Sequence, residues 1–113
     1  MILTRKFEFD SGHHLDVSDR EKKSHGHRYV LEVSVEGPAV RGFIIGIDEI
    51  KNVVNREVIE KLDHNYLNEI VENPTMENLI VWIWGKVKPH LPALSKLKLY
   101  ETPNNFVTYY GKG

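Results

Sequence analysis

Alternating hydrophobic and polar positions predict strands near both ends of the chain. Residues 2–9 and 28–36 alternate near the N-terminus, and the second run stops at a Gly-Pro turn signal. Residues 97–102 and 106–110 alternate near the C-terminus, on either side of a Pro-Asn-Asn turn. A period of two is typical of a strand with one buried face. We therefore expect a pair of strands at each end of the chain.

Helical spacing fills the middle of the chain in two segments. Apolar residues recur at near-helical intervals over residues 50–62, and Asp48 is expected to cap this first helix. A second apolar stripe over residues 79–87 predicts another helix with a purely structural, core-facing role. Thr75 suits its N-cap, and Glu77 in the first turn complements the helix dipole.

The order of these elements is β-β-α-α-β-β, with a short extended or bulged segment at residues 40–47. Strands at both ends and helices between them predict an α+β fold: an antiparallel four-stranded sheet with two helices on one face. Such a sheet has two edges, and small open sheets often pair between subunits. The 113 residues are expected to form one domain, residues 1–113.

Composition and charge narrow the classes of partner. The formal net charge is −1 and the pI is about 6.6, so the chain lacks the basic field that nucleic-acid binding requires. There is no cysteine, which excludes disulfides, thiolate zinc sites and a Cys nucleophile. We find neither a signal-peptide core nor an apolar run of transmembrane length. These features predict a soluble cytoplasmic protein with no membrane partner.

His25 and His27 flank Gly26 at the start of the second predicted strand. Residues i and i+2 of a strand point to the same face, so the two imidazoles form half of a metal site, with zinc the first metal to consider. His13, at the end of the first strand, is a candidate third ligand. Three histidines with one open position are typical of catalytic zinc. The alternatives are hydrogen-bonded histidines without a metal, and a solvent-exposed loop position for His13.

Two further groups carry candidate chemistry. Asp63 and His64 are adjacent in the break between the helices, and a histidine beside a carboxylate is a candidate general acid or base. The alternative is a solvent-exposed histidine at a helix C-terminus. Glu101 shares a strand face with apolar residues, where a carboxylate needs a partner such as the adjacent N–H donors of a heterocycle. The alternative is simple exposure at the end of the strand.

Taken together, these pieces resemble the 6-pyruvoyltetrahydropterin synthase / 6-carboxytetrahydropterin synthase family. The matching stretches follow the family's order and cover nearly the whole chain. They are Phe7-Glu8-Phe9 with Ser11-Gly12-His13, His25-Gly26-His27, Gly42-Phe43-Ile44-Ile45, Leu62-Asp63-His64 with Leu67-Asn68, Asn73-Pro74-Thr75 with Glu77, and Glu101-Thr102 with Tyr109 or Tyr110.

The resemblance implies the tunnelling fold, in which three subunits close a barrel and two trimers stack into a homohexamer. It implies a zinc-dependent lyase acting on 7,8-dihydroneopterin triphosphate, in which zinc binds the side-chain hydroxyls of the substrate and acidifies the adjacent C–H. Whether Mg²⁺ assists with the triphosphate is left open. The site residues that it implies are His13, His25 and His27 as zinc ligands, Glu101 as the pterin anchor, Thr75 and Glu77 as pocket residues, and Asp63 with His64 as a proton-transfer relay.

The chain departs from the family pattern at its catalytic position. The family has a Cys four residues before the first His of H-G-H, and this chain has Glu21 there. A free Glu titrates near 4.3 and a free Cys near 8.5, so the two groups differ as bases. Members with Glu at this position resemble a subgroup that cleaves the side chain to 6-hydroxymethyl-7,8-dihydropterin. The alternatives are a 6-pyruvoyl or 6-carboxy product made without Cys, and a pterin-binding protein without turnover.

Overall fold

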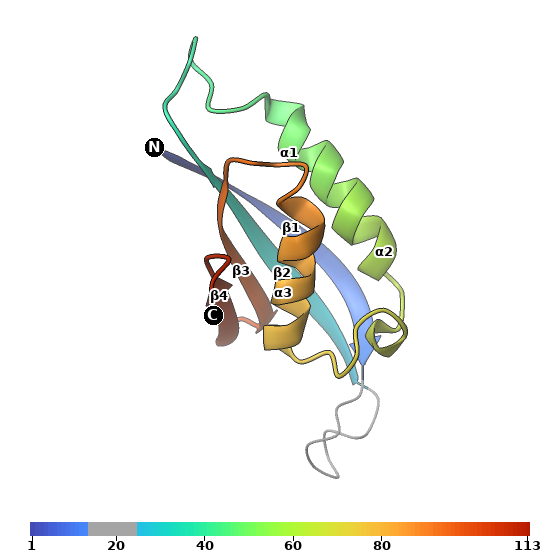
Figure 1. The fold of residues 1–113 in the computed structure, drawn as a ribbon. Helices are drawn as coiled ribbons and strands as arrows, with labels where there is room; N and C mark the ends of the chain where they lie inside the picture. The colour runs from blue at the N-terminus through green and yellow to red at the C-terminus, as the bar shows by residue number, and fades with distance from the viewer. Residues whose placement is uncertain (14–24) are drawn as a thin grey trace.

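The structure, a computed structural model, describes residues 1–13 and 25–113, so the predicted base Glu21 lies outside the described residues. Four antiparallel strands form one sheet in the order β1-β2-β3-β4 (Figure 1). Their bounds confirm the four predicted strands, and the first and third extend a few residues further than expected. The strands are β1 (Ile2–His13), β2 (His25–Glu36), β3 (Leu94–Thr102) and β4 (Asn105–Tyr109).

The helical residues lie between β2 and β3, as the spacing predicts. The first helical stretch is continuous and contains α1 (Ile47–Val54), the π-helical turn η1 (Asn55–Ile59) and α2 (Glu60–Leu62). The 3-10 turn η2 (Leu67–Glu69) precedes the second helix, α3 (Met76–Val87). The apolar pattern predicted both helices but neither η1 nor η2, because a single turn leaves too few positions to establish a period.

The helix starts confirm one predicted cap and correct another. Thr75 Oγ1 accepts a hydrogen bond from the backbone N–H of Asn78 at 3.1 Å, so Thr75 is the N-cap of α3. Asp48 is not the cap of α1, because the N-cap residue is Gly46 and Asp48 lies inside the first turn. A carboxylate in that position complements the helix dipole without capping a backbone N–H.

The segment at residues 40–47 adds no strand to the sheet. Val40 and Phe43 bridge each other across a tight turn, with φ of 54° at Arg41 and 87° at Gly42. Positive φ at both central residues is typical of the turns that join short hairpins. The prediction of an extended segment is therefore wrong over most of this range, which begins with a turn and leads into α1.

Both long helical stretches cover one face of the sheet, and the core lies between the two layers (Figure 1). Alternate residues of β2 and β3, among them Leu31 and Leu99, are fully buried against Leu79 and Ile83 of α3 and its neighbours. This burial follows from the period of two in the strands and the apolar stripe of the helix. The core thereby fixes the ends of β1 and β2 relative to the segment that joins the helices.

The sheet has two edges, β1 and β4. Pairing of these edges between subunits stays a prediction, as does the cytoplasmic location. None of the helices in the described part of the chain combines the length and apolar character needed to cross a bilayer.

Candidate active site at one end of the sheet

Three segments that are distant in sequence meet at one end of the sheet (Figure 1). The end of β1 pairs with the start of β2, and the chain between α2 and η2 crosses beside the end of β1. Two contacts fix this crossing: a parallel bridge joins Gly12 to Tyr66, and the Gly12 N–H donates to the carbonyl of Asn65 at 3.4 Å. Most of the predicted site residues lie in these segments.

The backbone register brings the three predicted zinc ligands close together along the β1–β2 pair. His13 lies directly opposite His25, and His27 lies opposite Ser11, two residues further along β2. The imidazole of His27 is 23% exposed, and its Nε2 lies 3.8 Å from Oε1 of Glu101. Adjacent backbone positions are what a three-histidine site requires, while the ligand role itself stays a prediction.

Glu101 lies at the C-terminal end of β3, at this end of the sheet. Its side chain is 24% exposed and lies beside the imidazole of His27, so the half-buried carboxylate has a partner. Next to them Tyr29 is buried, and burial together with the negative charge of Glu101 raises the pKa of the Tyr29 hydroxyl well above its ordinary value. Glu101 therefore lies close enough to Tyr29 for its charge to disfavour ionisation of the hydroxyl.

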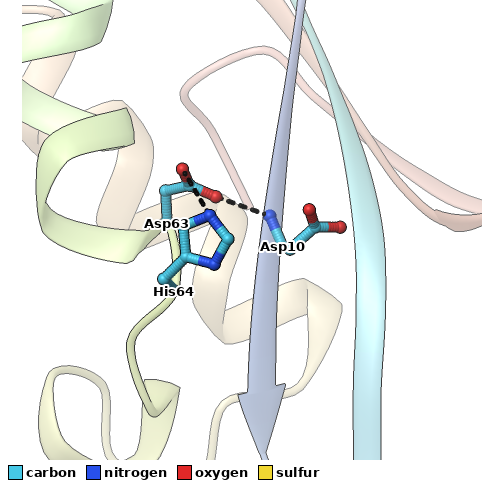
Figure 2. A group of neighbouring side chains, drawn as sticks. All are labelled: Asp10, Asp63 and His64. Carbon is cyan, nitrogen blue, oxygen red and sulfur yellow. Dashed lines mark hydrogen bonds and ion pairs between the residues drawn. The ribbon is translucent and has the colours of Figure 1, made fainter.

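Asp63 and His64 are held against β1 by backbone hydrogen bonds (Figure 2). One carboxylate oxygen of Asp63, Oδ1, accepts from the N–H of Asp10 at 2.8 Å, and the other, Oδ2, lies 3.5 Å from His64 Nε2. The N–H of His64 donates to the carbonyl of Asp10 at 2.6 Å. The His64 side chain is 77% exposed, as the alternative of a solvent-exposed histidine expected, but it is paired with Asp63.

A cavity of about 600 Å³ connects these groups. It lies open to solvent and brings His27 of β2 and His64 of the inter-helix segment to the same hollow. Among the described residues that line it, neither Thr75 nor Glu77 occurs: the Thr75 hydroxyl serves as the cap of α3, and Glu77 is exposed in the first turn. The lining residues are Asp10, Ser11, Gly12, His27, Arg28, His64, Asn65 and Tyr66.

Sequence reasoning missed Asp10 and Arg28, which face each other across the strand pair. Arg28 Nε and Nη2 donate to the two oxygens of Asp10 at 3.2 and 3.4 Å, and Nη1 lies 3.7 Å from Glu8 Oε2. The hydrogen bond and charge of Asp10 raise the pKa of the Arg28 guanidinium. This ion pair depends on the register of β1 and β2, which places Asp10 opposite Arg28, and the sequence alone does not give that register.

Asp10, Asp63 and His64 each offer a potential metal-ligand atom, and these atoms lie within 4.8 Å of one another (Figure 2). Their hydrogen bonds argue against a metal among them. The Asp10 carboxylate points toward β2, where Arg28 binds it, and one Asp63 oxygen is taken by a backbone N–H. A cation here would compete with the guanidinium, so we interpret the group as a hydrogen-bonded network that orients His64.

Comparisons with known proteins agree with this arrangement. The family described as 6-pyruvoyl tetrahydropterin synthase matches residues 2–112. The 6-pyruvoyl tetrahydrobiopterin synthase of Dictyostelium discoideum is 40% identical, over 99% of this chain and 97% of that protein. The dihydroneopterin monophosphate aldolase of Pyrococcus furiosus is also 40% identical, over 80% of this chain and 77% of that protein.

A solved structure gives the same result for the fold. The 6-pyruvoyl tetrahydropterin synthase of Caenorhabditis elegans superposes with a TM-score of 0.87 at 27% identity, covering 99% of this chain and 96% of that one. The α+β tunnelling-fold prediction is therefore confirmed at the level of the subunit. The chain belongs to the 6-pyruvoyl tetrahydropterin synthase family, whose members named here are enzymes of pterin metabolism.

Proposed function

We propose that this protein is a zinc-dependent lyase that cleaves the side chain of a 7,8-dihydroneopterin phosphate to give 6-hydroxymethyl-7,8-dihydropterin. Family membership supports a lyase of pterin metabolism, and the aldolase relative supports carbon–carbon cleavage in particular. The single observation that carries the choice of reaction is Glu21, in a chain that has no cysteine at all. The family's usual nucleophile or base is therefore replaced by a carboxylate.

The residues of the chain fit a zinc ion. His13, His25 and His27 would hold it, since their backbones are adjacent and three imidazoles with an open position suit catalytic zinc. When bound, zinc would act as a Lewis acid toward the hydroxyl groups of the substrate side chain. Glu101, beside His27, would orient the imidazole until substrate binds.

Glu101 is our proposed anchor for the pterin ring. A half-buried carboxylate accepts two parallel N–H bonds strongly, and the ring edge of a pterin offers such a pair. Thr75 and Glu77 at the start of α3 are proposed to help line the pocket when the ring is bound. In this arrangement the reacting side chain of the substrate extends from Glu101 toward the hollow that holds His64.

We propose that Asp63 and His64 move a proton within this hollow. Asp63 Oδ2 lies near His64 Nε2, which leaves Nδ1 as the atom that exchanges a proton with substrate. Glu21 would remove the proton from a side-chain hydroxyl, the carbon–carbon bond next to it would break, and that hydroxyl would become an aldehyde. The electron pair passes to the carbon attached to the pterin ring, which His64 then protonates.

The alternative functions are a 6-pyruvoyl or 6-carboxy product and a pterin-binding protein without turnover. The Dictyostelium relative favours the 6-pyruvoyl product, because its 40% identity extends over nearly the whole chain. The deciding experiment incubates zinc-loaded protein with 7,8-dihydroneopterin triphosphate and, separately, the monophosphate, each with and without Mg²⁺. Mass spectrometry identifies the products.

Each outcome of that experiment separates the candidates. A 6-hydroxymethyl product supports the proposal, and its loss in Glu21→Ala with pterin binding retained assigns the base. A 6-pyruvoyl or 6-carboxy product would show that Glu21 has not redirected the chemistry. Unchanged substrate with tight pterin binding would support the binding protein.

We also propose that the subunit assembles into a homohexamer through the edges β1 and β4. Among the described strands, β1 and β4 each pair with a strand on one side only, and such edges of small antiparallel sheets are commonly covered by another chain. Light scattering during size-exclusion chromatography measures the mass directly. A monomer of 13.1 kDa at micromolar concentration would contradict the proposal.

A further inference from the structure

We propose that Ser11 is a positioning residue that sets the geometry of Asp63 and His64 through the end of α2. This inference rests on the proposed function, because it assigns His64 a proton that must be delivered. Ser11 is 5% exposed, and only one other polar residue in the described part of the chain, Ser34, is buried as deeply. Its hydroxyl donates to the carbonyl of Leu62, the last residue of α2.

Leu62 lies two residues before His64, whose backbone conformation is strained. His64 has φ of +58°, a left-handed conformation that a residue with a side chain avoids unless its surroundings impose it. The Asn65 N–H donates to the same Leu62 carbonyl at 3.2 Å, closing the turn around His64. Helix-end carbonyls otherwise lack partners, so the Ser11 hydroxyl secures the side of the turn that enters from α2.

Ser11 complements two hydrogen bonds made by the backbone of Asp10. The N–H of Asp10 donates to the carboxylate of Asp63, and its carbonyl accepts from the backbone N–H of His64. Ser11 adds a buried side-chain hydrogen bond to this attachment, and that bond is accessible to mutation. Ser11 lines the cavity, but its hydroxyl hydrogen is directed at the Leu62 carbonyl, so we expect Ser11 to act on the reaction through His64.

The test compares Ser11→Ala with Ser34→Ala. Ser34 is fully buried on β2 and its hydroxyl bonds that of Thr4 at 2.7 Å, so the same atom is deleted from the far part of the same strand pair. For Ser11→Ala we expect kcat about tenfold lower with KM changed less than about twofold, the loss of one buried hydrogen bond. Hydrogen exchange of the His64 amide should accelerate about tenfold. Ser34→Ala should leave kcat and this amide unchanged at comparable global stability.

A second pair of variants controls for misfolding. Ser11→Thr keeps the hydroxyl, and Ser11→Val has the shape of the Thr variant without the hydroxyl. The proposal predicts near-normal kcat for Ser11→Thr, and for Ser11→Val a kcat as low as that of Ser11→Ala. Equal kcat in the Thr and Val variants, or equal His64 exchange in the two alanine variants, would overturn it. Should the parent protein lack turnover, the proposed function fails, while the exchange comparison still decides whether Ser11 positions His64.

Discussion

Two carboxylate–histidine pairs lie on the helical side of this protein, and they differ in what surrounds the carboxylate. Glu57 in η1 is 16% exposed and has two cationic neighbours, Arg56 Nε at 2.8 Å and Lys61 Nζ at 3.3 Å, and an imidazole, His90 Nε2, at 3.9 Å. The hydrogen bond from Arg56 is the main cause that lowers the pKa of Glu57. A carboxylate surrounded by several basic side chains is typical of a structural ion-pair network.

The Asp63–His64 pair has the opposite arrangement. Asp63 contacts one backbone N–H and one imidazole, and His64 faces an open hollow from a left-handed backbone conformation. Strained backbone and an oriented imidazole at a cavity are features that folding stability alone does not explain. The comparison teaches that a carboxylate beside a histidine is informative only together with its other partners.

Removing the metal is expected to have the largest effect, because it disables the site that the Asp63–His64 pair serves. Dialysis against a chelator should abolish turnover, and zinc should restore it. In His27→Ala, zinc affinity should fall by more than about 100-fold, measured by competition with a chromogenic chelator. His90→Ala serves as the matched control and should bind zinc normally. Normal zinc content in the His27 variant would contradict the three-histidine site.

Replacing the two histidines outside the proposed metal site tests the comparison itself. His64→Ala should lower kcat by about 10²- to 10⁴-fold, the usual contribution of a general acid or base. His90→Ala should change kcat less than about twofold, since its partner Glu57 keeps two other cations. Steady-state kinetics with the substrate identified above measures both. Equal losses in the two variants would remove the distinction between the pairs.

Glu101→Gln is expected to act on binding more than on turnover. Loss of a charge-assisted bidentate contact to the pterin ring should raise KM by about 10- to 100-fold with kcat largely retained. Glu32→Gln is the control, since Glu32 is a partly buried carboxylate that pairs with Lys6 at 3.8 Å. Pterin binding followed by fluorescence quenching gives the same comparison without turnover. Unaltered affinity in Glu101→Gln would exclude the anchor role.

The smallest effect is expected for stability at Glu57. Its pKa is lower in the folded protein than in the unfolded chain, so the carboxylate stabilises the fold above its unfolded value near 4.5. That contribution disappears as the pH falls through the lowered folded-state pKa. Glu57→Gln should therefore reduce Tm slightly at pH 7, and the difference should vanish in acid. A Tm difference that persists once the pH is below the folded-state pKa of Glu57, where the Glu and Gln side chains are both neutral, would indicate an effect of packing and not of charge.

The sequence predicted the fold well because periodicity is a local signal. Four alternating runs and two apolar stripes are sufficient to define an antiparallel sheet with helices on one face. The cap of α1 was misplaced from Gly46 to Asp48, because a carboxylate near a helix start is favourable at several positions and composition does not choose among them.

The site was predictable only where its partners are neighbours in sequence. Asp63 and His64 are adjacent, so their pairing was visible from the chain itself. The contact between His27 and Glu101 depends on the strand register, and the network around Asp10 and Ser11 depends on how the inter-helix segment lies on β1. Such contacts join residues more than fifty positions apart, and no local pattern encodes them.

The π-helical turn η1 sets the rotational phase at which the chain leaves the helix. Buried residues recur at every fourth position, at Ile50, Val54, Val58 and Leu62. An α-helix turns 100° per residue, so each step of four overshoots a full turn by about 40°. The wider turn of η1 takes up part of this drift and keeps Leu62 on the buried side. Deleting one residue there would leave a regular helix in which Leu62 lies only about 20° beyond three full turns from Ile50, so Asp63 would still face the strand that holds it. Converting η1 to a regular helix without the deletion would instead turn Asp63 away from that strand, by up to about 100°.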